Sequence, residues 1–234
     1  MKTKLLLTTL FGVAAWSLSS LAMANWNTGA CPGGGTAPCI ETEINGNTYH
    51  FNGSGGHAGV WHGRPAAEGG GEFTFSDDSV VLDCNPPTID CNLSLSGEVK
   101  KCQDSDGQWR IGVRVTGAST SGSFLCDALN ISGFPWYSKD PTIASHCPFE
   151  DNCDTFIPYD PSATTYTANF GDITVSSLLG TYVQDEHVEG VIFTPGVGAT
   201  FDFSNKTFYS CDEEAGCTID GILTLDNATS LDVY

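Results

Sequence analysis

Three histidines lie close together near the start of the chain, and imidazole nitrogens are common ligands of zinc and copper. His50, His57 and His62 are separated by glycine-rich sequence that includes FNGSGGHAGVWHG. The helical H-E-x-x-H spacing of a zinc enzyme is absent, and a glycine-rich loop does not hold imidazole rings in a fixed arrangement. We therefore expect these histidines to be loop residues, and we expect neither a metal nor another cofactor.

Paired carboxylates are the second group that could do chemistry. The doublets are Asp77-Asp78, Glu150-Asp151, Asp185-Glu186 and Glu213-Glu214. A glycosidase needs two carboxyl groups that face each other across a cleft. These doublets fall in turn-like segments, where acidic side chains usually face water, so the sequence gives no sign of that arrangement. His187 follows one doublet as a single imidazole with no partner visible in the sequence.

Two further patterns are weak. Asp104-Ser105-Asp106-Gly107 resembles the start of a calcium-binding loop, but the twelfth position is Val115 instead of glutamate, and the flanks are strand-like. The chain has no G-x-S-x-G sequence, which would place a nucleophilic serine on a strained turn. No catalytic arrangement emerges from the sequence, and we expect a non-enzymatic protein without catalytic, cofactor-binding or metal-binding residues.

Cysteine is the most informative residue type. The ten cysteines are Cys31, Cys39, Cys84, Cys91, Cys102, Cys126, Cys147, Cys153, Cys211 and Cys217. An even number of cysteines without any C-x-x-C pair indicates disulfides instead of a metal cluster. The spacing favours the close pairs Cys31/Cys39, Cys84/Cys91, Cys147/Cys153 and Cys211/Cys217, with Cys102/Cys126 bridging a hairpin. The sequence alone leaves the connectivity open.

The first 24 residues have the pattern of a signal peptide. Lys2 and Lys4 precede the apolar run LLLTTLFGVAAW, and Ala22-Met23-Ala24 is a typical cleavage sequence. The pattern is typical of bacterial export, so we expect a protein that passes through the periplasm and is secreted. No other segment approaches the roughly 20 apolar residues of a membrane span.

The charge of the chain is strongly negative. Aspartate and glutamate total 28, lysine and arginine total 9, and the formal net charge is −19 at pH 7. Such a surface repels nucleic acid and anionic membranes, which are therefore poor candidates as partners. The simplest interpretation of the acidity is solubility and mutual repulsion outside the cell.

The elements that would carry these residues are β-strands. From residue 72 onward, apolar residues alternate with polar ones in EFTFS, LSLSGEV, WRIGVRV, YTANFGDITV, VIF, TFDFS and GILTL. Turn residues separate these segments, and Asp106-Gly107 predicts a hairpin turn. We expect an all-β, antiparallel β-sandwich or barrel over residues 72–234, stapled by disulfides. A parallel β-helix is the structural alternative, although no fixed repeat supports it.

Two segments differ from this pattern. Residues 25–71 are rich in glycine and histidine and contain one candidate strand, Asn47–Phe51, so we expect a flexible arm or flap. Residues 138–163 contain four prolines and one close cysteine pair. We expect them to form a long ordered loop stapled by Cys147/Cys153.

The stretch FLCDALNISGFPW, residues 124–136, combines two kinds of apolar sequence. Its first part gathers apolar residues around Cys126 and has the composition of buried sequence. Its end, Phe134-Pro135-Trp136, holds two aromatic rings on either side of a proline, which fixes the backbone. These three residues are our candidates for contact with a hydrophobic substrate, and the alternative is that they pack inside the core.

Four motifs in this order resemble the protein activators of alkane oxidation, a family of small secreted bacterial proteins. The motifs are Cys91–Val99, Gly122–Cys126, Phe134–Trp136 and Cys217–Leu223. The resemblance covers about residues 90–225 and does not extend to the N-terminal region, the 138–163 segment or the high cysteine content. It implies an extracellular protein, without catalytic residues, that aids contact with or emulsification of liquid alkanes at an oil–water interface.

Two other functions remain open at the level of sequence. The chain could be a subunit of an extracellular matrix or fibre, with further copies of itself or other extracellular proteins as partners, in which the N-terminal arm adds a strand to a neighbour. It could also be a carbohydrate-binding module with Trp61, Trp109 or Trp136 as a stacking platform.

Overall fold

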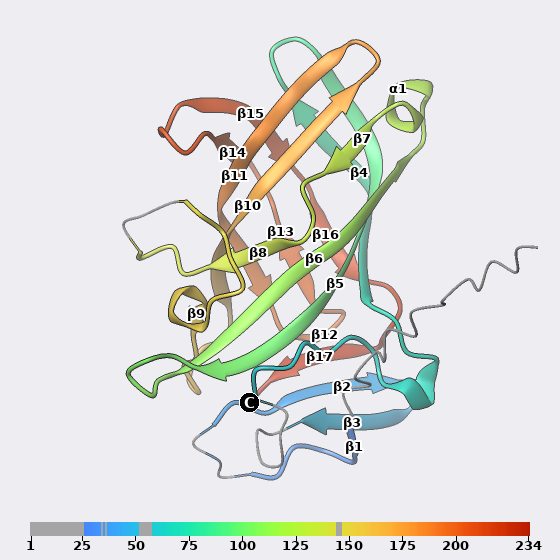
Figure 1. Ribbon diagram of the computed structural model, residues 1–234. Helices are drawn as coiled ribbons and strands as arrows, with labels where there is room; N and C mark the ends of the chain where they lie inside the picture. Colours follow the sequence, from blue (N-terminus) through green and yellow to red (C-terminus); the bar gives the residue numbers. More distant parts are fainter. Residues whose placement is uncertain (1–25, 34, 36, 52–57, 144–146) are drawn as a thin grey trace, which may run out of the picture.

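The computed structural model describes residues 26–33, 35, 37–51, 58–143 and 147–234. The expected signal peptide lies outside the described residues. Within them the chain is almost entirely β-strand, and every strand pairing is antiparallel (Figure 1), which confirms the expected fold class and excludes the parallel β-helix. The helical elements are short: α1 (Phe124–Asp127) and the 3-10 turns η1 (Ala66–Glu68) and η2 (Cys153–Thr155).

The larger sheet contains most of the strands. They are β4 (Phe73–Asp83), β5 (Thr88–Gln103), β6 (Trp109–Ser121), β7 (Asn130–Ser132), β8 (Trp136–Lys139), β9 (Ile157–Pro158), β10 (Tyr166–Ser177), β11 (Gly180–Thr194), β13 (Thr200–Asp202), β14 (Lys206–Tyr209), β15 (Ala215–Asp220) and β16 (Ile222–Leu225). Pairing runs β11-β13-β16-β4-β5-β6-β8-β10, and β10 pairs again with β11. The ring of hydrogen-bonded strands is therefore closed, as in a barrel.

A second, five-stranded sheet lies across one end of this barrel (Figure 1). Its order is β1 (Asn27–Thr28), β3 (Asn47–Phe51), β2 (Ile40–Ile44), β17 (Ser230–Val233) and β12 (Gly196–Val197). Ile40 from β2, Phe51 from β3 and Leu231 from β17 belong to the same buried cluster as the barrel core. We call this sheet the cap, because its inward face closes the barrel end.

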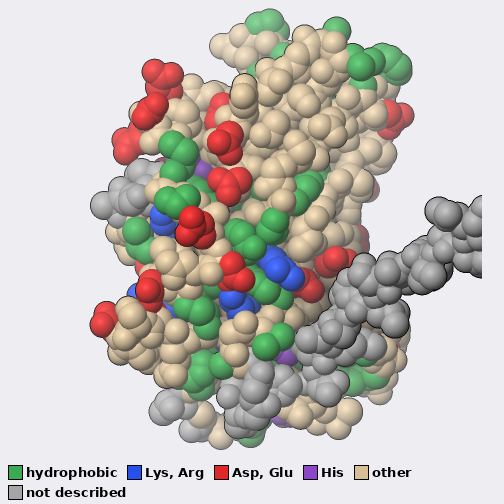
Figure 2. Space-filling model, in the orientation of Figure 1, with side chains coloured by type: hydrophobic (Ala, Val, Ile, Leu, Met, Phe, Trp, Pro, Cys, Tyr) green, Lys and Arg blue, Asp and Glu red, His purple; other side chains and the backbone are tan. Residues whose placement is uncertain are grey.

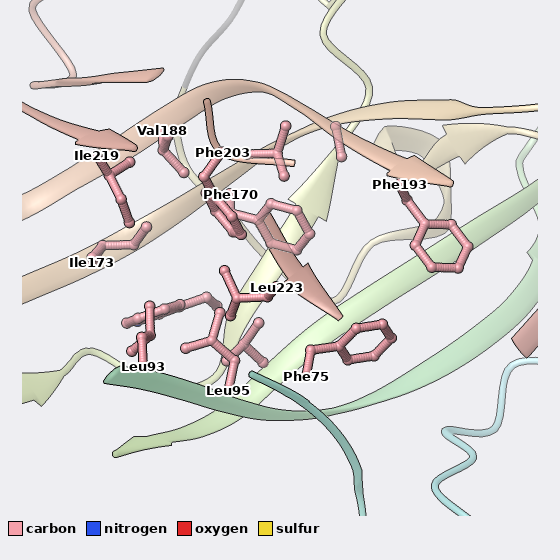
Figure 3. Close-up of a cluster of buried hydrophobic side chains, with 14 of the residues drawn as sticks. Phe75, Leu93, Leu95, Phe170, Ile173, Val188, Phe193, Phe203, Ile219 and Leu223 are labelled. Atoms are coloured by element: carbon pink, nitrogen blue, oxygen red, sulfur yellow. The ribbon is translucent and has the colours of Figure 1, made fainter. Parts of the chain in front are cut away.

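Alternation along the strands explains how the core forms. In β5, the side chains of Ile89, Cys91, Leu93 and Leu95 point inward, and the residues between them face out or are only partly buried. Phe73 and Phe75 on β4 are buried in the same way, as the EFTFS pattern predicts. The core is rich in phenylalanine, and Figure 3 shows rings and branched side chains from several strands meeting in the barrel interior.

The β5–β6 hairpin confirms the predicted turn at Asp106-Gly107. The backbone N–H groups of Asp106 and Gln108 donate to Asp104 Oδ1, and Gly107 has a φ of +77°, which favours glycine. The Asp104 side chain thus organises a turn, so the calcium-loop resemblance has a structural explanation. Arg110 donates from Nε to Asp104 Oδ2 over 2.8 Å, and this hydrogen bond lowers the pKa of the Asp104 carboxyl.

The N-terminal region is not a loose arm, and that prediction is wrong for its described part. Asn47–Phe51 is a strand, as predicted, but Ile40–Ile44 pairs with it along five residue pairs and pairs on its other side with β17. The Lys101 Nζ of β5 donates to the carbonyl of Pro38 over 2.6 Å. Glycine-rich composition masked a short hairpin whose apolar face, Ile40 and Phe51, is fully buried.

All ten cysteines form disulfides, as predicted, and no cysteine is free. The bridges are Cys31–Cys39, Cys84–Cys217, Cys91–Cys126, Cys102–Cys153 and Cys147–Cys211. Only the first of the favoured local pairs is correct. A chain with this many disulfides is typical of compartments outside the reducing cytosol.

Strand register explains why the local pairing is wrong. Cys91 lies opposite Val80 within the β4–β5 ladder, several residues away from Cys84. Because β5 and β6 are antiparallel, the end of β6 returns to the start of β5, where Ser121 pairs with Asn92. Cys126 follows Ser121 closely and therefore bridges to Cys91 instead of Cys102.

The 138–163 segment is tied to the barrel at two points, not stapled within itself. Cys153 bridges to β5, and Cys147 bridges to Cys211 in the connection from β14 to β15. Phe156 is fully buried against β6, where a Cβ on Gly112 would come within 2.8 Å of its ring. Glycine at this position lets the ring lie directly on the strand.

Candidate functional site

The short helix α1 presents two apolar side chains to solvent. Ser123 caps it, with Oγ accepting from the N–H of Cys126, and the disulfide to Cys91 holds Cys126 inside. A single helical turn that directs Cys126 inward must direct its neighbours outward. Phe124 is 81% exposed and Leu125 is 43% exposed.

The turn between β10 and β11 presents two more apolar side chains to solvent. Ser177 pairs with Gly180, so Leu178 and Leu179 form a two-residue hairpin loop, and they are 92% and 79% exposed. The Ser177 Oγ lies 2.7 Å from the Tyr182 hydroxyl and accepts from the N–H of Leu179 over 3.0 Å. These hydrogen bonds fix the loop, so the leucines are held out by an ordered turn.

The helix and the turn belong to one end of the barrel. Asn130 of β7, just after α1, pairs with Ser176 of β10, just before the turn. Tyr182 of β11 packs against the small buried cluster that contains the Cys91–Cys126 bridge. We call this surface the apolar end and define it as Phe124, Leu125, Leu178 and Leu179. It lies opposite the cap in Figure 1.

The apolar end is also poor in charge. No charged residue occurs from Val115 to Cys126 or from Ile173 to Gln184, although the chain has 28 acidic residues. In Figure 2 the upper right of the molecule is mostly uncharged, with hydrophobic side chains at the top, whereas acidic groups gather over the upper left. Seven large apolar side chains are exposed among the described residues, and four of them lie here.

Several basic side chains, by contrast, are held in ion pairs near the barrel wall. Lys100 pairs with Asp151, Arg110 with Asp104 and Asp140, and Arg114 with Glu98. In the 150–151 doublet, Asp151 also accepts from Trp61, and the hydrogen bonds from Lys100 and Trp61 outweigh burial and lower the pKa of its carboxyl. Pairing neutralises these cations locally and leaves most unpaired charge on the surface negative.

Trp136 lies in the core, and Phe134 and Pro135 are partly buried, so the core alternative is correct for Trp136 and its interpretation as an exposed contact point is wrong. Trp136 is 6% exposed, and its Nε1 donates to the carbonyl of Ser132 over 3.1 Å. The Phe134 ring stacks on it at 4.5 Å between centroids. The proline places the two rings against each other and against the core, and it does not project them into solvent.

The histidines are structural where they are described. His62 is fully buried and stacks on the Phe51 ring at 3.8 Å, and His50 lies 2.7 Å from the carbonyl of Gly29 through Nδ1. His57 lies outside the described residues. His187 is buried and has a partner that the sequence did not reveal, because its Nε2 lies 3.2 Å from Glu189 Oε1.

The remaining sequence candidates do not assemble into a site in the described part of the chain. No group of three or more His, Cys, Asp or Glu side chains there has the arrangement of a metal site. In the doublet at 77–78, Asp77 accepts from the N–H groups of Ser79 and Ile222 and thus shapes a strand irregularity.

Trp61 and Trp136, two of the three tryptophans considered as stacking platforms, are covered by other side chains or buried. Lys100 and Arg114 lie over the Trp61 ring at 4.6 and 4.7 Å from its centroid. Trp109 is only partly exposed and lies near the Lys101 ammonium, and Trp136 is buried. A sugar ring would have to displace charged groups to reach Trp61.

The apolar end was missed at the level of sequence, although a signal existed. A hairpin turn is normally polar, and Ser-Ser-Leu-Leu-Gly places two leucines at the turn itself. For Phe124 and Leu125, the surrounding apolar residues suggested burial, and only the one-turn helix around Cys126 determines which side faces out.

Comparison with known proteins gives no match: no family model, no curated protein and no solved structure is similar to this chain.

The helices of the described chain are all too short and too polar to cross a lipid bilayer.

Proposed function

We propose that this protein is a secreted, non-enzymatic, surface-active protein that contacts hydrophobic substrates through its apolar end. The observation that carries the proposal is the concentration of ordered, exposed apolar side chains on one end of a strongly acidic molecule, an end that carries little charge besides Asp127. Exposed apolar clusters on folded proteins usually mark an interaction surface. The partner in this proposal is an oil–water interface or a liquid hydrocarbon.

The energetics of adsorption support this function. Transfer of one Phe or Leu side chain from water to an apolar phase is worth about 1.5–3 kcal/mol. Four such side chains on ordered supports lose little conformational entropy on contact. The acidic remainder of the surface stays in water and keeps adsorbed or free molecules apart.

The resemblance to alkane-oxidation activators points the same way. Two of its four motifs, Cys91–Val99 and Gly122–Cys126, meet in the Cys91–Cys126 bridge that supports α1. A third, Phe134–Trp136, lies beneath the same region in the core. The proposal therefore transfers the contact role from Phe134-Pro135-Trp136 to the exposed residues that these motifs support.

Each alternative function was suggested by a feature of the sequence that the described structure does not support. The fibre hypothesis needed a free N-terminal arm, but the described part of residues 25–51 is already paired within its own chain. The carbohydrate hypothesis needed an open tryptophan, but the Trp61 ring is covered by two cations, Trp136 is buried and Trp109 is only partly exposed.

The test is pendant-drop tensiometry at a hexadecane–water interface. The wild-type protein should lower the interfacial tension, and the double variant Leu178→Ser with Leu179→Ser should do so more slowly and to a smaller extent. Val197→Ser is the matched control, because Val197 is 84% exposed but lies in the cap sheet. Equal losses in both variants, or a wild-type protein without surface activity, would contradict the proposal.

A further inference from the structure

The interior of the barrel contains two adjoining apolar cavities, of about 60 and 70 Å³. Both are lined by Leu95, Trp136, Ile173, Val188 and Phe203. Figure 3 shows Leu95 on one side of the interior, with Phe170 and Phe203 on the other. The shared lining residues place the two cavities next to each other, and we refer to the pair as the internal space.

The space runs along the barrel between its two ends. The first cavity reaches the cap, where Ile40 and Leu231 line it. The second reaches the region beneath α1, where Cys91, Leu129 and Ile131 line it. An occupant would therefore lie lengthwise, with one end near the apolar end.

The apolar lining of the two cavities makes them unfavourable sites for bound water. A buried water needs about two to four hydrogen-bonding partners. The few polar groups at the edges are already engaged: Arg114 pairs with Glu98, the Thr120 hydroxyl donates to the carbonyl of Cys126, and the Trp136 N–H donates to Ser132. What remains facing the space is hydrocarbon.

The size of the space also suits a small hydrocarbon. A dry cavity of about 150 Å³ lined by Leu, Ile and Phe in another protein binds benzene. The two cavities together approach that volume, but their elongated arrangement suits a linear chain better than a ring. Both cavities have partly buried lining residues, Leu129 and Ile131 beneath α1 and Val113 and Val233 toward the cap.

We propose that the two adjoining cavities together bind one short, unsubstituted hydrocarbon chain of roughly six carbons. Binding inside the barrel goes beyond the proposed surface function and does not rest on it. A polar or charged head group has no partner within the space, so an alkane should bind better than the alcohol of the same length.

The experiment is a titration of the methyl-labelled protein with n-hexane, followed by NMR. We expect saturable shifts of the Leu95, Ile173 and Val188 methyl groups, and a higher midpoint of thermal unfolding in hexane-saturated buffer. Hexan-1-ol should bind about tenfold more weakly, because its hydroxyl would be left without a partner. Shifts confined to Leu178 and Leu179, or no shifts at hexane saturation, would overturn the proposal.

Variants separate this site from the surface. Val188→Phe fills the shared part of the space and should abolish the saturable shifts. If that variant does not fold, Val188→Ala enlarges the space and should favour n-octane over n-hexane relative to wild type. Unchanged chain-length preference in Val188→Ala, or unchanged hexane binding in folded Val188→Phe, would contradict an internal site.

The double variant Leu178→Ser with Leu179→Ser should bind dissolved n-hexane with unchanged affinity, because it leaves the lining intact. Loss of tensiometric activity with intact hexane binding would locate the two functions in separate parts of the barrel. A wild-type protein that binds hexane but has no surface activity would end the surface proposal and leave this one standing. Loss of hexane binding in the double variant would contradict the internal assignment.

Discussion

The two ends of the barrel contain similar apolar residues, but these residues are buried at one end and exposed at the other. At the cap, Phe51 is fully buried between Trp26, at 4.8 Å, and His62, at 3.8 Å between ring centroids. At the opposite end, Phe124 and Leu178 project into solvent. The difference lies in what covers them, because a five-stranded sheet lies over the first end and a single helical turn supports the second.

The comparison shows that exposed apolar groups here are held out by rigid supports. The Cys91–Cys126 bridge lies under α1, and the Ser177–Tyr182 hydrogen bond lies under the hairpin turn. A flexible loop with the same residues would fold its leucines back onto the surface. In this account the cap end stabilises the fold, whereas the apolar end contacts the hydrophobic phase. Substitutions at the two ends should therefore affect stability and adsorption separately.

The largest expected effect concerns two disulfides, one in each part of the molecule. Cys84–Cys217 joins residues separated by 133 positions within the barrel, whereas Cys31–Cys39 spans 8 positions near the cap. The other bridges remain in the first variant and shorten its loop, so loop-closure entropy predicts that replacing the first pair by alanine lowers the free energy of unfolding by about 4 kcal/mol, and the second by about 2.5 kcal/mol. Denaturant unfolding of both double variants measures the difference, and equal losses would contradict this ranking.

A matched pair of truncations compares the two ends directly. Phe51→Ala should lower the free energy of unfolding by about 3–5 kcal/mol, because it removes a fully buried ring. Leu178→Ala should change it by less than about 0.5 kcal/mol, because its side chain is in water. Urea titration measures both. If Phe51→Ala were neutral, the cap would not be part of the cooperative unit.

Trp136 tests the assignment of the core. Trp136→Ala should cost about 3–5 kcal/mol of unfolding free energy, because the side chain is buried beside the internal cavities. Adsorption to hexadecane droplets, measured per folded molecule, should be unchanged. Reduced adsorption with normal stability would indicate that Phe134-Pro135-Trp136 contacts the hydrophobic phase after all.

Lys101, beneath the cap, gives a small, pH-dependent effect on stability. Burial lowers the pKa of its ammonium from 10.5 to about 8 in the folded protein, whereas the unfolded chain keeps an ordinary value. Above about pH 8 the folded protein therefore releases a proton that the unfolded chain retains. The free energy of unfolding should rise from this group by about 1 kcal/mol between about pH 7 and about pH 9.

Lys101→Met is the control for this rise, because methionine has a long apolar side chain without a titratable group. The pH-dependent increase should disappear in the variant, whatever its absolute stability. Above about pH 10 the trend should reverse, because burial raises the pKa of Tyr166 to about 12 and the unfolded chain then ionises first. A variant with the wild-type slope between about pH 7 and about pH 9 would assign the slope to another group.

The fold class followed from the sequence because a period of two persists over parts of the long strands, although bulges interrupt it in the β4–β5 and β10–β11 ladders. The turn at Asp106-Gly107 and the strand Asn47–Phe51 were predictable for the same local reasons. The partners of the cysteines were not, because they depend on how far β6 runs before it turns. That distance is set by the whole barrel and not by the spacing between cysteines.

The contact surface was harder to predict than the fold. Phe124 and Trp136 lie in one stretch of similar hydrophobicity, yet one is exposed and the other is buried. Which of them faces solvent depends on the Cys91–Cys126 bridge and on β8, and both are tertiary features. Composition identifies apolar residues, but only the packing around them distinguishes a core from a contact surface.

Hydrogen exchange with and without hexadecane droplets, followed by mass spectrometry, tests most directly whether the apolar end meets the apolar phase. We expect added protection in peptides covering residues 124–130 and 176–182 and unchanged exchange in the cap strands at 40–51 and 230–233. Protection at the cap, or equal protection over the whole chain, would contradict the assignment of contact to the apolar end.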